Sequence, residues 1–248
     1  SARKPYSRSK SHQRFLSILK RFHKRLNLIG LIFTSPLGVV PRTLERVYPA
    51  ADYDIPVTGD WTQAERNMAN QAFQDVLGKF SPNIPVLVHL NEIERAVLQD
   101  ALQNVKQEVL FSDFSSAPHS DKGLQALESM MIEALESYQP PLKRVNEKLQ
   151  ILIDTINFQF GKETAKALFD GSEIIKGKHH IRMQAYREND LILTYNGLSG
   201  MVTLSWPAAE QLMIQKIHFV HFDGIKLEGS TLFCSAIIDA DEKIRPGD

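Results

Sequence analysis

The first twelve residues, SARKPYSRSKSH, bring together side chains that can do acid–base or nucleophile-assisting chemistry. His12 titrates near neutral pH and can serve as a proton donor or as a base. Lys4 can lower the pKa of a neighbouring thiol or hold a phosphate, and Tyr6 can stack on a nucleobase or hydrogen-bond to it. Each also has a structural alternative: His12 and Lys4 can be ordinary surface residues at a helix start, and Tyr6 can pack against the helix.

Two further candidates, Asp54 and Asp60, lie in a Pro- and Gly-rich stretch over residues 35–60. That composition predicts a long, structured loop of the kind that often forms a site. Carboxylates in such a loop can orient an incoming ammonium group. Asp60 can instead be a turn residue preceding a helix that opens at Thr62.

Four further histidines give no sign of a metal site. His89 stands at the end of a predicted strand, where we expect a structural role. His119, His179 and His180 have no partners at metal-ligand spacing, and the sequence has no Gly-rich phosphate loop of the Walker or dinucleotide type. We therefore predict neither a metal nor a cofactor.

The charge is unevenly distributed although the formal net charge is zero. Residues 1–25 contain nine Lys or Arg and no Asp or Glu. Such a block favours a phosphate backbone or another polyanion, and the alternative is a solvated basic helix face without a partner. The nucleic-acid-binding candidates in this block are Arg14, Lys20, Arg21, Lys24 and Arg25.

Composition places the chain among globular proteins of a reducing compartment. Of the 248 residues, 43% are hydrophobic and 23% charged, and Cys234 is the single cysteine, so no internal disulfide can form. No apolar run approaches the ~20 residues that span a bilayer, and the N-terminal stretch lacks the apolar region of a signal peptide. We expect a cytoplasmic protein.

Helices and strands alternate in the first part of the chain, which predicts an α/β core with a mainly parallel sheet over 1–138. Apolar residues at helical spacing run through the basic block, from Phe15 to Leu26. Thr62 and Asn91 are expected to cap helices. Strands are predicted at 28–33, 85–90 and 109–111, and a further helix at 120–138.

The pattern changes after Gln139-Pro140-Pro141, where the preceding helix must end. Pro141 is expected in the first turn of a helix that reaches about Phe158, followed by a short piece from Lys162 to Phe169. Short strands with turns then predict a small β-barrel or sandwich. The domains expected are an α/β core at 1–138, a helical linker at 139–169 and a β-domain at 170–248.

The β-domain resembles a PUA domain, the RNA-binding pseudobarrel of tRNA-guanine transglycosylases and pseudouridine synthases. The segments that carry the resemblance are FDGSEIIKG from Phe169, NGLSG from Asn196, GSTLF from Gly229 and DADEKIRPGD from Asp239. The resemblance implies tRNA binding, with Lys176, Lys178 and Arg182 as candidate contacts. Residues 171–248 hold eight basic and ten acidic residues, so recognition is expected to depend on shape and a few local contacts.

The N-terminal segment resembles the motif of the archaeosine synthase family, in which Pro-Cys is followed after three residues by Lys-Pro-Tyr, then by Ser and His at fixed spacing. The matching residues are Lys4, Pro5, Tyr6, Ser9 and His12, and the family's Pro-Cys would stand immediately before Ser1. The stretch from Ser35 to Trp61 also resembles this family's core domain.

The resemblance implies an archaeal tRNA-modifying transferase. A 7-cyano-7-deazaguanine base in tRNA would have its nitrile converted to an amidine by an amine donor, with lysine favoured, and a radical-SAM partner protein would release the final product. A cysteine thiolate can add to a nitrile to give a thioimidate, which an amine then displaces. Two alternatives remain open: a non-catalytic tRNA-binding PUA protein, and a transglycosylase fragment that shares only the linker and PUA domain.

Overall fold

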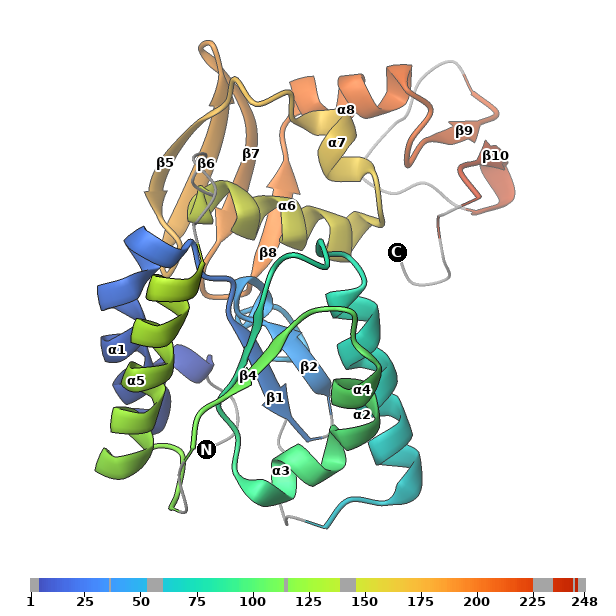
Figure 1. Cartoon of the computed structure of the whole chain (residues 1–248). Coiled ribbons are helices and arrows are strands. Elements are labelled where there is room, and N and C mark those ends of the chain that lie inside the picture. Colours follow the sequence, from blue (N-terminus) through green and yellow to red (C-terminus); the bar gives the residue numbers. More distant parts are fainter. Residues whose placement is uncertain are drawn as a thin grey trace. The chain divides into compact units, whose positions relative to one another are not determined.

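The computed structural model divides the chain into two compact units, Ser1–Val145 and Asn146–Asp248 (Figure 1). Lys4 and Asp54 lie outside the described residues, as does the side chain of Lys24. The residues that the structure describes are 5–35, 37–52, 60–113, 116–138, 146–224, 234–242 and 244. No described helix has the length and apolar character needed to cross a membrane.

Two long helices form one side of the first unit. Helix α1 (Lys10–Leu26) ends at Asn27, which adopts a left-handed conformation with φ of 53°. Helix α5 (Asp121–Ser137) lies beside it (Figure 1). The contact is apolar because Ile18 and Phe22 of α1 are buried in one cluster with residues of α5, namely Leu127, Met130 and Met131. The basic block is therefore part of a packed helix with a buried stripe, as its periodicity predicts.

A β-hairpin follows α1. Strand β1 (Leu31–Thr34) pairs antiparallel with β2 (Gly38–Pro41), and Thr34 faces Gly38 in the register. Gly38 has φ of 72°, a conformation that favours glycine and allows the chain to reverse here. A 3-10 helix, η2 (Arg42–Leu44), comes directly after β2. The stretch predicted as one long loop therefore begins with regular structure.

The next strands form a separate pair. Strands β3 (Val86–Val88) and β4 (Val109–Phe111) run parallel, with Val86 opposite Val109. Two short helices, α3 (Glu92–Val97) and α4 (Gln99–Asn104), connect them. The described part of the first unit thus contains one antiparallel and one parallel pair, so the mainly parallel sheet expected from the alternation is not confirmed.

Helix α2 (Gln63–Leu77) begins as predicted. The Thr62 side chain accepts a hydrogen bond from the Glu65 backbone, and the Glu65 carboxylate accepts one from the Thr62 backbone. Asn91 and Glu94 make the same reciprocal pair at the start of α3. These two caps confirm the helix starts because a capping box satisfies backbone N–H groups that the helix leaves without partners.

The second unit has a helical and a β part around one core. Helix α6 (Glu147–Phe160) and α7 (Thr164–Leu168) pack on an antiparallel sheet of order β5-β6-β7-β8. The helix start predicted at Pro141 lies outside the described residues. The strands are Ile174–Lys178, Arg182–Arg187, Asp190–Asn196 and Met201–Leu204.

A helix that the sequence-based prediction lacked, α8 (Trp206–Ile214), covers the same core. Ser205 precedes it and Pro207 stands in its first turn, a combination that is typical of a helix start. Strands β9 (Val220–Phe222) and β10 (Ile237–Ala240) form a separate antiparallel pair. The mixed α/β class is confirmed, and the strands described in this unit form two sheets rather than a closed barrel.

Candidate functional site

The motif residues Tyr6, Ser9 and His12 come together at the start of α1. Tyr6 opens a 3-10 helix, η1 (Tyr6–Arg8), and Ser9 is the N-cap of α1. The Ser9 hydroxyl accepts a hydrogen bond from the His12 backbone N–H at 3.3 Å. The Ser-x-x-His spacing of the motif therefore reflects a helix N-cap: Ser9 caps α1, and His12 lies in its first turn.

Three side chains surround the His12 imidazole. The Tyr6 ring centroid lies 5.4 Å from that of His12, and the Phe15 ring meets the imidazole edge-on with centroids 5.7 Å apart. The Arg42 guanidinium, from η2, places Nη2 3.4 Å from His12 Nδ1. Burial, and then the positive charge of Arg42, lower the pKa of His12 from 6.5 to about 4. At neutral pH this imidazole is uncharged.

A buried carboxylate joins Arg42 to the N-terminal turn. Glu45 is 5% exposed, and one of its oxygens lies 3.5 Å from Arg42 Nη1. The same oxygen, Oε2, accepts a hydrogen bond from the Ser7 backbone N–H at 3.0 Å. Sequence reasoning missed Arg42 and Glu45 as functional candidates. Their opposite charges three residues apart, next to the apolar stretch that ends at Val40, were a usable signal because buried charges need partners.

His89 makes the contacts expected of a structural residue. Its Nδ1 lies 2.8 Å from the Ser112 hydroxyl, and its Nε2 lies 2.9 Å from the Pro118 carbonyl oxygen. These bonds tie the residue after β3 to the residues after β4. Its ring also meets the Phe15 ring edge-on at 5.4 Å, so Phe15 lies between His12 and His89. Burial lowers the pKa of His89.

The basic residues of α1 differ in their surroundings. Arg14 pairs with Asp121, and Arg21 Nη1 lies 2.6 Å from Glu128 Oε1, both acidic partners belonging to α5. Lys20 and Arg25 are exposed. Part of the predicted polyanion-binding charge is therefore neutralised within the unit, and Lys20 and Arg25 become the stronger candidates.

The second group of predicted contacts shares one face of the β5-β6 ladder. Lys178 is directly opposite Arg182 in the register, and Lys176 is two residues from Lys178 on the same face. Met183 and Ala185 point to the other face, where both are fully buried. The Lys176 ammonium lies 4.7 Å from the centroid of the Tyr186 ring. Lys176, Lys178 and Arg182 are all exposed.

Asp60 is exposed and precedes the Thr62 cap of α2. Its participation, like that of Lys4 and Asp54, stays a prediction. Among the described residues, no group of three or more His, Cys, Asp or Glu is arranged to hold a metal ion.

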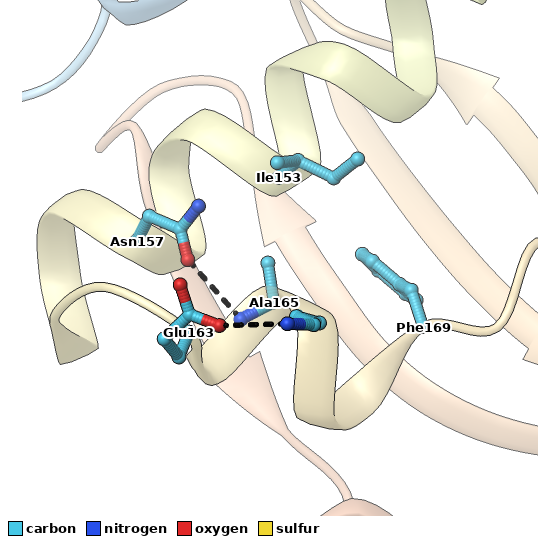
Figure 2. A pocket seen from close by; sticks show the side chains of 6 residues that line it. Ile153, Asn157, Glu163, Ala165 and Phe169 are labelled. Carbon is cyan, nitrogen blue, oxygen red and sulfur yellow. Dashed lines mark hydrogen bonds and ion pairs between the residues drawn. The ribbon is translucent and has the colours of Figure 1, made fainter.

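A pocket of about 200 Å³ is lined by residues of α6 and α7 and by the residues that adjoin α7. The Asn157 side-chain oxygen accepts a hydrogen bond from the Ala165 backbone N–H at 3.2 Å, and the Lys166 ammonium pairs with Glu163 at 3.3 Å (Figure 2). The polar groups of the pocket lining named here are therefore paired with one another. The lining contains none of the predicted site residues and consists of Ile153, Asn157, Glu163, Ala165, Lys166 and Phe169.

Residues 1–131 match the family described as Domain of unknown function (DUF5591), and the chain belongs to that family. Curated relatives carry a more specific name. The chain is 31% identical over 254 residues to the archaeosine synthase subunit alpha of Methanosarcina acetivorans and 29% identical over 255 residues to that of Thermococcus kodakarensis. It is 28% identical over 254 residues to the archaeosine synthase of Haloferax volcanii. The resemblance of the N-terminal segment to the archaeosine synthase family is confirmed as a family relationship.

Each alignment covers 100% of this chain and 40%, 42% and 41% of the three relatives, respectively. The chain thus spans about two fifths of the length of these relatives. The structure is also similar to the crystal structure of AF0587, a protein of unknown function, with a TM-score of 0.70 and 24% identity. That match covers 100% of this chain and 78% of the other, and it shows a shared fold.

Proposed function

We propose that this chain takes part in archaeosine-type tRNA modification, converting the nitrile of 7-cyano-7-deazaguanine in tRNA to an amidine by amine addition, with lysine as the favoured donor. One observation carries the proposal: similarity to proteins named archaeosine synthase extends over 100% of the chain. The clustering of Tyr6 and the Ser9 cap around His12 supports it, because the motif residues then serve one site.

The overall reaction needs no oxidant and no leaving group. The amine nitrogen forms a bond to the nitrile carbon, and one π bond of the nitrile moves its electron pair to the nitrile nitrogen. The proton lost by the amine nitrogen balances the proton gained by the nitrile nitrogen. A thioimidate formed by a cysteine thiolate would lead to the same product, with the thiol released when the amine displaces it.

Each candidate residue is proposed to have a separate role in this reaction. A preorganised donor at the nitrile nitrogen stabilises the negative charge that develops there, and His12 is the candidate donor. Tyr6 is placed beside the imidazole, where it can contact the modified base. Lys4, Asp54 and Asp60 remain proposed contacts for phosphate or for the ammonium group of the amine donor. A radical-SAM partner that releases the final product also belongs to the proposal.

We further propose that the second unit is a PUA-type RNA-binding domain. Its support is the antiparallel β5-β6-β7-β8 sheet, which presents Lys176, Lys178 and Arg182 on one exposed face. Basic side chains on a fixed surface can contact phosphate and sugar without reading sequence. The three domains 1–138, 139–169 and 170–248 are retained as a proposal, with α6 and α7 sharing the core of the sheet.

Nucleoside mass spectrometry of tRNA that carries the nitrile base tests the proposal. The intact protein, incubated with this tRNA and lysine, should form a lysine adduct. His12→Ala should lower the adduct rate by about 10²-fold or more while tRNA affinity stays within about twofold of wild type, because the proposed RNA contacts lie elsewhere. The control is His119→Ala, which removes an exposed histidine of the same unit.

Two outcomes would count against this assignment. Wild-type adduct formation by His12→Ala would exclude His12 from the site. Tight tRNA binding without adduct formation by the wild-type protein would favour the alternative function, a non-catalytic tRNA-binding PUA protein.

A further inference from the structure

The pairing between Arg42 and His12 specifies which imidazole nitrogen carries the proton. A guanidinium has five N–H donors and no acceptor. Nδ1 of His12, 3.4 Å from Arg42 Nη2, must therefore offer its lone pair. In a neutral imidazole the proton then belongs to Nε2.

Arg42 also forms an ion pair with a buried carboxylate. Glu45, which is 5% exposed, lies 3.5 Å from Arg42 Nη1 and also accepts the Ser7 backbone N–H. Residue 7 belongs to the turn that carries Tyr6. One carboxylate thus links the guanidinium to the segment whose side chains form the candidate site, and a side chain held in this way can impose one tautomer on its neighbour.

We propose that Arg42 is a positioning residue that holds His12 in the Nε2–H tautomer, so that the imidazole acts as a neutral hydrogen-bond donor to the nitrile nitrogen rather than as the base that deprotonates the amine. This inference rests on the proposed function for its substrate and on the Arg42–His12 contact for its geometry. The lowered pKa of His12 agrees with it, because a neutral ring is required.

The alternative role conflicts with the contact. To accept a proton at Nε2, a neutral His12 would carry its proton on Nδ1 and direct that N–H toward another donor. This arrangement would lose a hydrogen bond and set two donors against each other. Deprotonation of the ammonium group consequently falls to a group other than His12.

The tautomer can be read by NMR without any substrate, from ¹⁵N signals of the full chain labelled at histidine and assigned with His12→Asn. The wild-type protein should show the Nε2–H form between about pH 6 and pH 8, where a group with a pKa of about 4 is neutral. Arg42→Met removes both donor and charge, so the two tautomers should mix and the His12 pKa should rise toward 6.5. Arg42→Lys keeps a charged donor that has no acceptor, so the Nε2–H form and the lowered pKa should both persist.

A wild-type Nδ1–H tautomer, or an unchanged tautomer in Arg42→Met, would overturn the inference. Loss of the Nε2–H form in Arg42→Lys would do the same, and this variant also serves if Arg42→Met does not fold. In the adduct assay, Arg42→Met should lower kcat by roughly 10–100-fold at unchanged KM for tRNA, and Arg42→Lys should recover most of this loss. Absence of adduct from the wild-type protein would contradict the proposed function instead, since the NMR result does not depend on turnover.

Discussion

Arg42 Nη2 lies 3.4 Å from Nδ1 of His12, although the two residues are 30 positions apart in the sequence. His12 belongs to the first turn of α1, whereas Arg42 follows strand β2. The β1-β2 hairpin lies between them in the chain and returns Arg42 toward the helix start: the Arg42 backbone N–H donates to the Gly30 carbonyl at 2.9 Å. The chemistry available to His12 therefore depends on the hairpin as much as on the motif.

The pH dependence of stability should reveal His12. Its pKa is lowered from 6.5 to about 4, so between these values the unfolded chain binds a proton that the folded chain does not. Stability should therefore rise as the pH rises from about 4 to about 6.5 and then level off, by on the order of 1–3 kcal/mol from this group. Urea unfolding of wild type and His12→Gln at about pH 5 and about pH 7.5 measures this change in the free energy of unfolding.

The variant should show the smaller difference between the two pH values, and His89, whose pKa is also lowered by burial, contributes to the part that remains. Equal pH dependence in both proteins would contradict a buried, neutral His12.

Glu45→Gln should destabilise the first unit by about 1–3 kcal/mol, because it removes the carboxylate that Arg42 and the Ser7 N–H share in a buried site. Chemical denaturation followed by circular dichroism is the measurement. The matched control is Glu128→Gln, whose partner Arg21 is 52% exposed at the side chain. Pairs of that kind contribute about 0–1 kcal/mol, so equal destabilisation of the two variants would show that Glu45 has no special role.

Charge reversal at Lys20 and Arg25 should weaken tRNA binding and flatten its salt dependence. For each phosphate that the protein no longer neutralises, the slope of log affinity against log salt should fall by about 0.7–0.9, the range between single-stranded nucleic acid and B-form DNA. Filter binding over a range of salt concentrations gives this slope. Arg21→Gln is the control, because Glu128 already neutralises Arg21, and it should change the slope less. A larger change of slope in Arg21→Gln than in the charge-reversal variant would instead place the polyanion contact on the side of α1 that faces α5.

Replacing Lys176, Lys178 and Arg182 together with alanine should lower tRNA affinity while leaving the fold intact, since all three lie on the exposed face of the β5-β6 ladder. Competition binding against wild type, with thermal unfolding to check the fold, is the measurement. Lys166→Ala provides a control at an exposed lysine that is paired with Glu163. Unchanged affinity in the triple variant would remove this face from the proposed interface.

Local sequence signals predicted several elements accurately. The strand Val109–Phe111 has the bounds expected from its apolar pattern, and Thr62 and Asn91 cap helices as their spacing with Glu65 and Glu94 requires. These features depend on neighbours within a few residues. The motif from Lys4 to His12 likewise identified the family from the sequence, because its residue types and spacing are read directly from the chain.

Strand direction could not be predicted in the same way. A run of apolar residues is compatible with parallel or antiparallel pairing, and the left-handed conformation of Gly38 sends β2 back along β1. Alternation of helices and strands alone suggested a mainly parallel sheet. The pairing that formed depends on a turn whose geometry no periodicity specifies.

The sequence by itself identified His12 as one of the titratable candidates for the site, and it showed that Lys and Arg residues are concentrated in the helical segment that contains His12. Only the tertiary structure decided that this imidazole is neutral, that Arg42 faces its Nδ1, and that Arg21 is paired with Glu128 while Lys20 is exposed. The physical reason is that a pKa and a tautomer depend on desolvation and on charges a few ångströms away. Folding brings those charges from segments that are distant in the chain.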